Sequence, residues 1–228
     1  MVLINSIFCK ITLSNNAMFS PQVIKASNLS CIRGENTLFD ELELSVSAGQ
    51  CLHVTGPNGS GKTSLLRIIA GLNTPDSGHV TWNQSSTSNN THYFSNCAYI
   101  AHKDGLKNEL TAIENLRYYQ QLEGAKDEDA LDEGLQKMGL LSRADLAAQK
   151  LSFGQRRRLA FARLLISAFP VWILDEPFTG IDTHGRELIE SLCVSHLQQQ
   201  GLIIMTHHQS LKGSVLNPYR KELALSAS

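Results

Sequence analysis

Apolar residues form short continuous runs in the second half of the chain. The segments VWIL (171–174) and LIIMT (202–206) are almost wholly apolar. Strands whose two faces are both covered show such runs, because neither face meets water. Earlier, LELSVSAGQCLHVT (42–55) predicts two strands broken by a turn at 48–50, and two more strands are expected at 79–84 and 97–101. Strands that alternate with helical segments predict an α/β fold with a parallel sheet.

Three stretches have the composition of helices. A glycine-rich loop at 56–61 precedes a predicted helix that ends at Gly71. From residue 111 to about 146, TAIENLRYYQQL and DALDEGLQKMGLL are amphipathic and rich in helix formers, which predicts a helical insert between two halves of the sheet. Another helix is expected from Gly154 to about Phe169, where Pro170 stops it.

The length of 228 residues fits one domain of this class. We expect an extension at 1–21, a folded domain at 22–215 whose helical part spans about 104–165, and a tail at 216–228. The extension is interpreted as disordered or as preceding the true start, for which Met18 is the candidate. Twenty basic and 21 acidic residues leave a net charge of −1, so the chain lacks the positive excess of a nucleic-acid-binding protein.

Other composition features exclude several classes of protein. The five cysteines are odd in number and widely spaced without a C-x-x-C pair, which favours a reducing compartment over a disulfide or zinc framework. The longest apolar stretch, 159–174, is interrupted by Arg163 and Pro170 and is too short to span a membrane. The first residues lack the order of a signal peptide, because the lysine follows the apolar run.

The loop at 56–63 fits the phosphate-binding pattern G-x-x-x-x-G-K-S/T, between a predicted strand and a predicted helix. Its glycines let backbone N–H groups surround an anion at the helix N-terminus. Lys62 adds a positive charge, and Thr63 offers a hydroxyl to Mg²⁺. The pattern predicts a nucleoside triphosphate and Mg²⁺ as ligands, and alone it does not separate kinases, GTPases and transport ATPases. The sequence has no N-K-x-D motif for guanine recognition, which favours ATP. The predicted nucleotide contacts are Gly56, Pro57, Asn58, Gly59, Ser60, Gly61, Lys62, Thr63 and Ser64.

Two acids, Asp175 and Glu176, follow the apolar strand at 171–174. Ligands of open α/β sheets bind at the carboxyl ends of strands. We expect Asp175 to hold Mg²⁺ through a water molecule and Glu176 to act as the general base toward the γ-phosphate. The alternative is a solvated strand end, which is less favoured because acids so close to a buried strand are costly without a partner.

Three further motifs carry a family resemblance. The segment LSFGQ (151–155) resembles the LSGGQ signature of ABC ATPases, TGID (179–182) resembles their D-loop, and THHQ (206–209) resembles their switch-histidine loop. With the phosphate loop and the acidic pair, five elements of this family occur in its order, over about residues 23–210.

The resemblance implies a P-loop NTPase of the ABC type, an α/β nucleotide-binding domain with a helical subdomain and an antiparallel β subdomain. It also implies a head-to-tail dimer that holds nucleotide between its two copies, each signature helix completing the other copy's phosphate site. The residues implied for nucleotide contact are Ser152, Gly154, Gln155 and Asp182. His208 is the catalytic switch residue, favoured over His207 because Gln209 follows it, although the choice between the two histidines stays open.

The chain departs from the family at several positions. Phe153 replaces a small residue, and we expect that this position does not need positive φ. No aromatic residue precedes the phosphate loop where adenine stacks, so Arg33 is the candidate, a plain loop arginine being the alternative. Arg156 and Arg157 are interpreted as a solvated basic face and His53 as a core histidine.

His102 stands where ABC proteins place a glutamine. The surrounding sequence resembles the corresponding segment of the CcmA family, the ATP-binding subunits of cytochrome c biogenesis haem exporters. The segments concerned are YIAHKDGLK (99–107) and ELTAIENL (109–116). We expect His102 to act through a water molecule or as a hydrogen-bond sensor, since imidazole is a poor ligand for Mg²⁺. The resemblance implies permease partners of the CcmB and CcmC type and a peripheral location on the cytoplasmic face of the bacterial inner membrane.

Two alternatives to this function stay open. One is the ATPase subunit of another small ABC exporter, and the other is a non-catalytic nucleotide-gated scaffold, against which Glu176 argues. A DNA-repair ABC ATPase would need a coiled-coil insertion far longer than the insert present here.

Overall fold

The computed structural model describes residues 18–124, 127–207 and 213–226. Two sheets organise the chain. The strands β1 (Val23–Arg33), β2 (Asn36–Ser47), β4 (Ser77–Trp82) and β5 (Ser85–Ser86) form an antiparallel sheet in the order β2-β1-β4-β5. The strands β6 (Cys97–Ile100), β7 (Val171–Leu174), β8 (Leu202–Thr206), β3 (Cys51–Thr55) and β9 (Arg220–Ala224) form a parallel sheet in that order.

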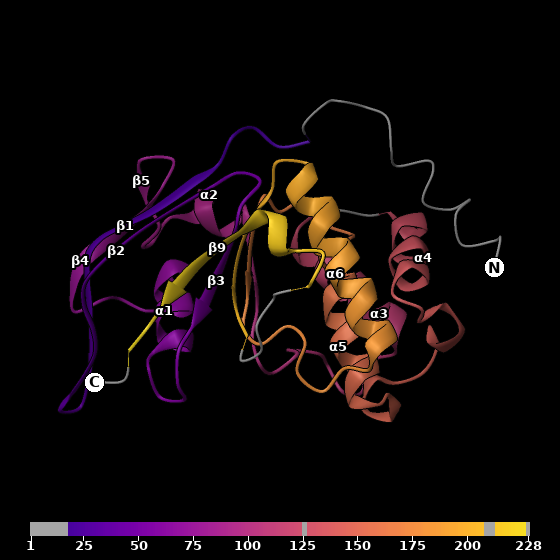
Figure 1. Ribbon diagram of the computed structural model, residues 1–228. Helices are drawn as coiled ribbons and strands as arrows, with labels where there is room; N and C mark the ends of the chain where they lie inside the picture. Colours follow the sequence, from indigo (N-terminus) through magenta and orange to yellow (C-terminus); the bar gives the residue numbers. More distant parts are fainter. Residues whose placement is uncertain (1–17, 125–126, 208–212, 227–228) are drawn as a thin grey trace.

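The helices lie in two places. Figure 1 shows the antiparallel sheet at one end of the molecule, the larger helices gathered at the other, and α1 beside β3. The helices are α1 (Lys62–Ile69), α2 (Thr91–Phe94), α3 (Ala112–Leu122), α4 (Glu128–Lys137), α5 (Phe153–Ala162) and α6 (Thr183–Gln198). Among the described residues, none of these helices combines the length and apolar character needed to cross a bilayer.

Both faces of the parallel sheet are covered, which explains its apolar runs. Val171 and Ile173 belong to the core that contains α1 and the antiparallel sheet. Trp172 and Leu174 belong to the second core, which contains residues of α3, α4, α5 and α6. All four side chains are buried, so alternation of polar and apolar residues is absent from β7.

Several predicted elements are confirmed. The turn at 48–50 separates β2 from β3, and strands lie at the predicted apolar runs. The helix after the glycine-rich loop ends just before Gly71, whose φ is +72°. The helix expected at 154–169 is shorter, because the backbone tightens after Ala162 into i→i+3 hydrogen bonds at Leu164 and Leu165.

Two elements differ from the sequence prediction. The segment expected to be a tail contributes β9, which pairs with β3, and Leu225 after it is buried and donates to the Thr55 carbonyl at 2.8 Å. The sequence RKELA has no apolar run, because an edge strand is only partly covered. Helix α6 was not predicted, although Asp182 at its N-terminus has the signal of a helix cap.

Candidate active site

The loop between β3 and α1 packs closely against other parts of the chain. At Gly56 φ is +145°, and a Cβ there would lie 2.5 Å from the carbonyl oxygen of Leu225. Only glycine fits this approach of two backbones. The Lys62 side chain is 8% exposed, and its Nζ donates to the carbonyls of Gly56 and Pro57, both at 2.8 Å. The loop thus closes around its own ammonium group.

The loop fits a polyanionic ligand such as a nucleotide phosphate. Among the described residues, Lys62 has no carboxylate partner, and the buried Ser60 hydroxyl has no hydrogen-bond partner. A buried positive charge and an unpaired hydroxyl at a helix N-terminus are the groups that a phosphate would satisfy.

Asp175 connects the end of β7 to two neighbouring elements. Its Oδ2 accepts a hydrogen bond from the Thr63 hydroxyl on α1 at 3.0 Å, and its Oδ1 accepts one from the Thr206 hydroxyl at the end of β8 at 2.7 Å. The carboxylate is 3% exposed. The oxygen atoms of Thr63 and Asp175 are hard donors and fit Mg²⁺.

Glu176 follows directly and has an unusual backbone. Its φ is +52°, in the left-handed region that few residues other than glycine adopt. Its N–H donates to the Thr206 hydroxyl at 2.9 Å. Its Oε2 accepts from the Thr179 hydroxyl at 3.2 Å and lies 3.7 Å from Nδ1 of His207. The carboxylate is thus held next to an imidazole.

His207 is buried beside the site. Its ring meets the ring of Phe178 edge-on, with centroids 5.2 Å apart. Its carbonyl lies 3.0 Å from Nε2 of His53, which is buried in β3 as expected, and burial lowers the pKa of His53. His208, the switch residue favoured by the sequence, lies outside the described residues. His207, the alternative left open in the sequence, contacts Glu176 and Phe178.

The interpretation of Arg157 as part of a solvated face is wrong. Its side chain is 1% exposed and its guanidinium donates to four main-chain carbonyls, including that of Asp175 at 2.7 Å. Burial lowers the pKa of Arg157, and the nearby carboxylate of Asp104 opposes this shift. Arg156 is partly exposed and lies 3.7 Å from the same carboxylate. Sequence spacing did not reveal this burial, because α5 carries three consecutive arginines with the same chemistry.

The signature segment begins α5 with a capping box. The Ser152 hydroxyl accepts from the N–H of Gln155 at 3.2 Å, and the Gln155 side chain accepts from the N–H of Ser152 at 3.0 Å. Phe153 is not among the described residues with positive φ, as expected, and it is 50% exposed. A Cβ on Gly180 would lie 2.4 Å from the Phe153 ring, so the phenylalanine packs where a side chain at residue 180 would stand.

The remaining predicted site residues that the structure describes make their contacts elsewhere in the fold. Gly154 lies next to Gly180, since a Cβ added to Gly154 would be 3.5 Å from the carbonyl oxygen of Gly180. Asp182 caps α6 by accepting from the N–H of Gly185 at 2.8 Å. Arg33 is exposed at the end of β1 and donates to the neighbouring Ile32 carbonyl at 3.1 Å, and His102 is exposed in the loop after β6.

Thr206 belongs to this cluster, although the sequence alone did not identify it as a site residue. A signal existed, since Thr206 ends an apolar run as Asp175 follows one, and carboxyl ends of adjacent parallel strands meet at one edge. Thr179 was quoted only as part of a motif, yet it hydrogen-bonds the Glu176 carboxylate.

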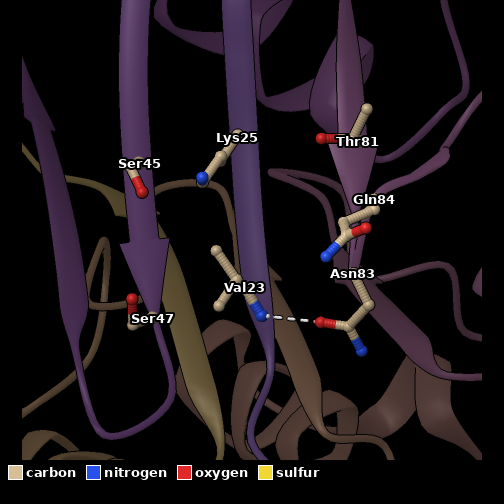
Figure 2. Close-up of a pocket in the computed structure, with 7 residues that line it drawn as sticks. All are labelled: Val23, Lys25, Ser45, Ser47, Thr81, Asn83 and Gln84. Carbon is tan, nitrogen blue, oxygen red and sulfur yellow. Dashed lines mark hydrogen bonds between the residues drawn. The ribbon is translucent and has the colours of Figure 1, made fainter.

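A hollow of about 440 Å³ lies elsewhere, on the antiparallel sheet (Figure 2). It is lined by Val23, Lys25, Ser45, Ser47, Thr81, Asn83 and Gln84. None of the residues of the cluster described above lines it, and among the described residues that do, Lys25 is the charged one. It offers no pair of groups for acid–base chemistry.

Comparison with known proteins gives consistent results. Residues 39–179 match the family described as ABC transporter. The chain is 43% identical over 190 residues to the cytochrome c biogenesis ATP-binding export protein CcmA of Aliivibrio fischeri, covering 83% of this chain and 93% of that protein. It is 45% identical over 201 residues to the CcmA of Haemophilus influenzae, covering 87% and 95%.

Solved structures share the fold. The dimeric ATP-binding cassette MJ0796, in a post-hydrolysis state bound to ADP and Pi, superposes with a TM-score of 0.78 at 23% identity. The match covers 90% of this chain and 96% of that one. The α/β architecture with a parallel and an antiparallel sheet, expected from the sequence, is confirmed.

Proposed function

The chain belongs to the ABC transporter family and, within it, to the CcmA-type ATP-binding subunits, and from this premise we propose that it hydrolyses ATP to drive a cytochrome c biogenesis complex. The work of that complex is haem export or the release of a haem-loaded chaperone. The observation that carries the proposal is the cluster of Lys62, Thr63, Asp175 and Glu176 at the edge of a parallel sheet.

The chain's own groups divide the work on ATP. The loop amides, Lys62 and the Ser60 hydroxyl bind the phosphates, and the remaining loop residues predicted from the sequence line the same site. Thr63 and Asp175 would hold Mg²⁺, Asp175 through a water molecule as expected from the sequence, and the ion would supply positive charge to the phosphate oxygens. Arg33 is the candidate to stack on adenine.

Glu176 is the general base. Its carboxylate accepts a proton from the attacking water, and Thr179 and His207 lie against it and restrict its orientation. Because Thr206 hydrogen-bonds both Asp175 and the backbone of Glu176, the metal ligand and the base keep a constant separation. His208 is the proposed switch residue that contacts the γ-phosphate.

A second copy of the chain completes the site. Ser152, Gly154 and Gln155 at the start of α5 would face the γ-phosphate bound by the other copy, with Asp182 at the interface. A helix N-terminus that is capped by a neutral serine favours an anion there. Hydrolysis then separates the copies and moves the membrane subunits, which we propose are of the CcmB and CcmC type at the cytoplasmic face of the bacterial inner membrane.

The test uses a strain that lacks the gene and is scored for mature c-type cytochromes. The wild-type chain should restore them, and Glu176→Gln should not. Purified Glu176→Gln should bind ATP normally, turn over at least about 100-fold more slowly and accumulate as an ATP-bound dimer. If Glu176→Gln restores normal levels of c-type cytochromes, a nucleotide-gated scaffold is favoured. If the strain that lacks the gene already has normal levels of c-type cytochromes, another ABC exporter is favoured.

A further inference from the structure

Arg157 is the only arginine among the described residues that is almost completely buried, at 1% exposure. It lies in the second turn of α5, five positions after Ser152. Its Nη2 donates to the carbonyls of Asp175 at 2.7 Å and Glu176 at 3.0 Å, and its Nε donates to the carbonyl of Pro177 at 3.3 Å. One guanidinium therefore binds three consecutive carbonyls of the segment that carries the base.

Three consecutive carbonyls do not converge in an extended strand, where successive groups point to opposite sides. They converge here because Glu176 adopts φ of +52°. That conformation is unfavourable for a residue with a side chain, and it persists only where its surroundings hold it. Thr206 binds the N–H of Glu176 and Arg157 binds its carbonyl, so both sides of this residue are fixed.

The same guanidinium reaches the loop after β6. Its Nη1 donates to the carbonyl of Ala101 at 2.7 Å and lies 3.4 Å from Oδ1 of Asp104, which is 9% exposed. Asp104 therefore compensates the buried charge. Ala101 immediately precedes His102, so Arg157 connects the start of the signature helix, the catalytic strand end and the loop of His102.

We propose that Arg157 is a positioning residue for ATP hydrolysis, which holds the backbone of Asp175–Pro177 so that the Glu176 carboxylate reaches the attacking water. The inference rests on the proposed function, because it assigns Arg157 an action through the base Glu176. It predicts loss of turnover without loss of nucleotide binding, since the hydrogen bonds of Arg157 within the described part of the chain go to carbonyls outside the phosphate loop.

The test compares Arg157→Lys with Arg158→Lys in the full chain assembled with its membrane subunits. Lysine keeps the charge opposite Asp104, but a single nitrogen cannot satisfy carbonyls of four residues in the geometry of a planar guanidinium. Arg158 is the matched control, because it is the next residue on α5 and donates to the carbonyl of Met138, away from the catalytic segment. Thermal unfolding of both variants verifies that they are folded.

Arg157→Lys should lower kcat by at least about tenfold, toward the 100-fold that a misplaced catalytic group costs, with the Kd for ATP changed less than about threefold. Arg158→Lys should leave kcat within about twofold of the wild type. In single-turnover measurements, Glu176→Gln and the double variant Glu176→Gln/Arg157→Lys should be equally slow, because Arg157 acts through a base that is already absent.

Three results would overturn the positioning role while Glu176→Gln remains slow. The first is an unchanged kcat in Arg157→Lys, and the second is a loss of ATP affinity in Arg157→Lys as large as its loss of kcat. The third is a double variant whose single-turnover rate falls below that of Glu176→Gln by the same factor as Arg157→Lys falls below the wild type. Wild-type turnover in Glu176→Gln alone would instead refute the proposed function, and the role of Arg157 with it. The two failures are thus distinguished by the single Glu176→Gln variant.

Discussion

The Thr63 hydroxyl donates to the Asp175 carboxylate at 3.0 Å, although 112 positions separate the two residues in the chain. Thr63 lies in the first turn of α1, and Asp175 directly follows the strand β7 of the parallel sheet. Thr206, 31 positions beyond Asp175, donates to the other oxygen of the same carboxylate at 2.7 Å. The three residues bring hard oxygen donors together where we propose that Mg²⁺ is held.

Thr206→Val should impair both stability and catalysis. Valine has the shape of threonine without the hydroxyl, so the Glu176 N–H and one Asp175 oxygen lose their partner. Leaving such buried groups unpaired costs about 1–3 kcal/mol, which urea unfolding measures. The Mg²⁺-dependent ATPase rate should fall as well, whereas the control Thr206→Ser should retain most of both properties. Equal stability of the valine and serine variants would contradict this account.

Ser152→Asp should separate helix capping from the proposed contact with the other copy's nucleotide. Aspartate caps helices as well as serine does, so the free energy of unfolding should change by less than about 0.5 kcal/mol. A carboxylate near the γ-phosphate adds repulsion of about 1–4 kcal/mol, which should weaken ATP-dependent dimerisation at least about fivefold. Light scattering in a Glu176→Gln background measures the dimer.

The control is Ser152→Ala, which should lose about 1 kcal/mol of stability by removing the cap while adding no charge. If the aspartate variant dimerises like the parent, Ser152 serves only the helix.

His196 should make the protein less stable in mild acid. Its ring stacks on Trp172 with centroids 3.7 Å apart, and burial lowers the pKa of His196 to about 3. Above pH 6.5 the imidazole is neutral in both the folded and the unfolded chain. As the pH falls from 6.5 toward 3, the unfolded chain takes up a proton that the folded chain does not, so stability is lost, by about 2 kcal/mol at pH 5.

Urea unfolding at pH 8 and pH 5 measures this loss. His196→Phe keeps a ring against Trp172 and removes the titrating group, so its stability should fall by about 2 kcal/mol less over the same interval. The same pH dependence in both proteins would assign the acid sensitivity to other groups.

His102→Gln should alter communication with the membrane subunits more than the chemistry of hydrolysis. His102 is exposed, and it follows Ala101, whose carbonyl Arg157 binds. We expect the isolated chain to stay folded, since substitutions at exposed loop positions cost little stability, and its ATPase rate to stay within about twofold. Stimulation of that rate by the membrane subunits should change. If neither rate changes, His102 is not a sensor.

Much of the site could be predicted because its parts are local. The phosphate loop, the acids after β7 and the signature segment at the start of α5 are each defined by neighbours within eight residues, and the structure contains a helix or strand end where the sequence indicated it. Apolar runs likewise predicted β7 and β8, because a strand that is buried on both faces consists almost entirely of apolar residues.

Other features of the structure could not be predicted from neighbouring residues in the sequence. Arg157 is one of three identical side chains in a row, and only the packing of α5 against the end of β7 decides that it is the buried one. The strand β9 is polar in composition and is defined by its pairing with β3. His207 and His208 are adjacent residues of the same type, so the sequence does not show which of them contacts Glu176. The contact of His207 with Glu176 depends on the path of the chain after β8.

The amino-acid sequence by itself determined the chemistry, namely a phosphate-binding loop, two acids after a buried strand and a signature segment, because each depends on residues adjacent in the chain. Only the tertiary structure decided which groups hold that chemistry in place. The sheet order β6-β7-β8-β3-β9 brings Thr63, Asp175 and Thr206 to one edge, and contacts across such distances depend on strand order, which local patterns do not encode.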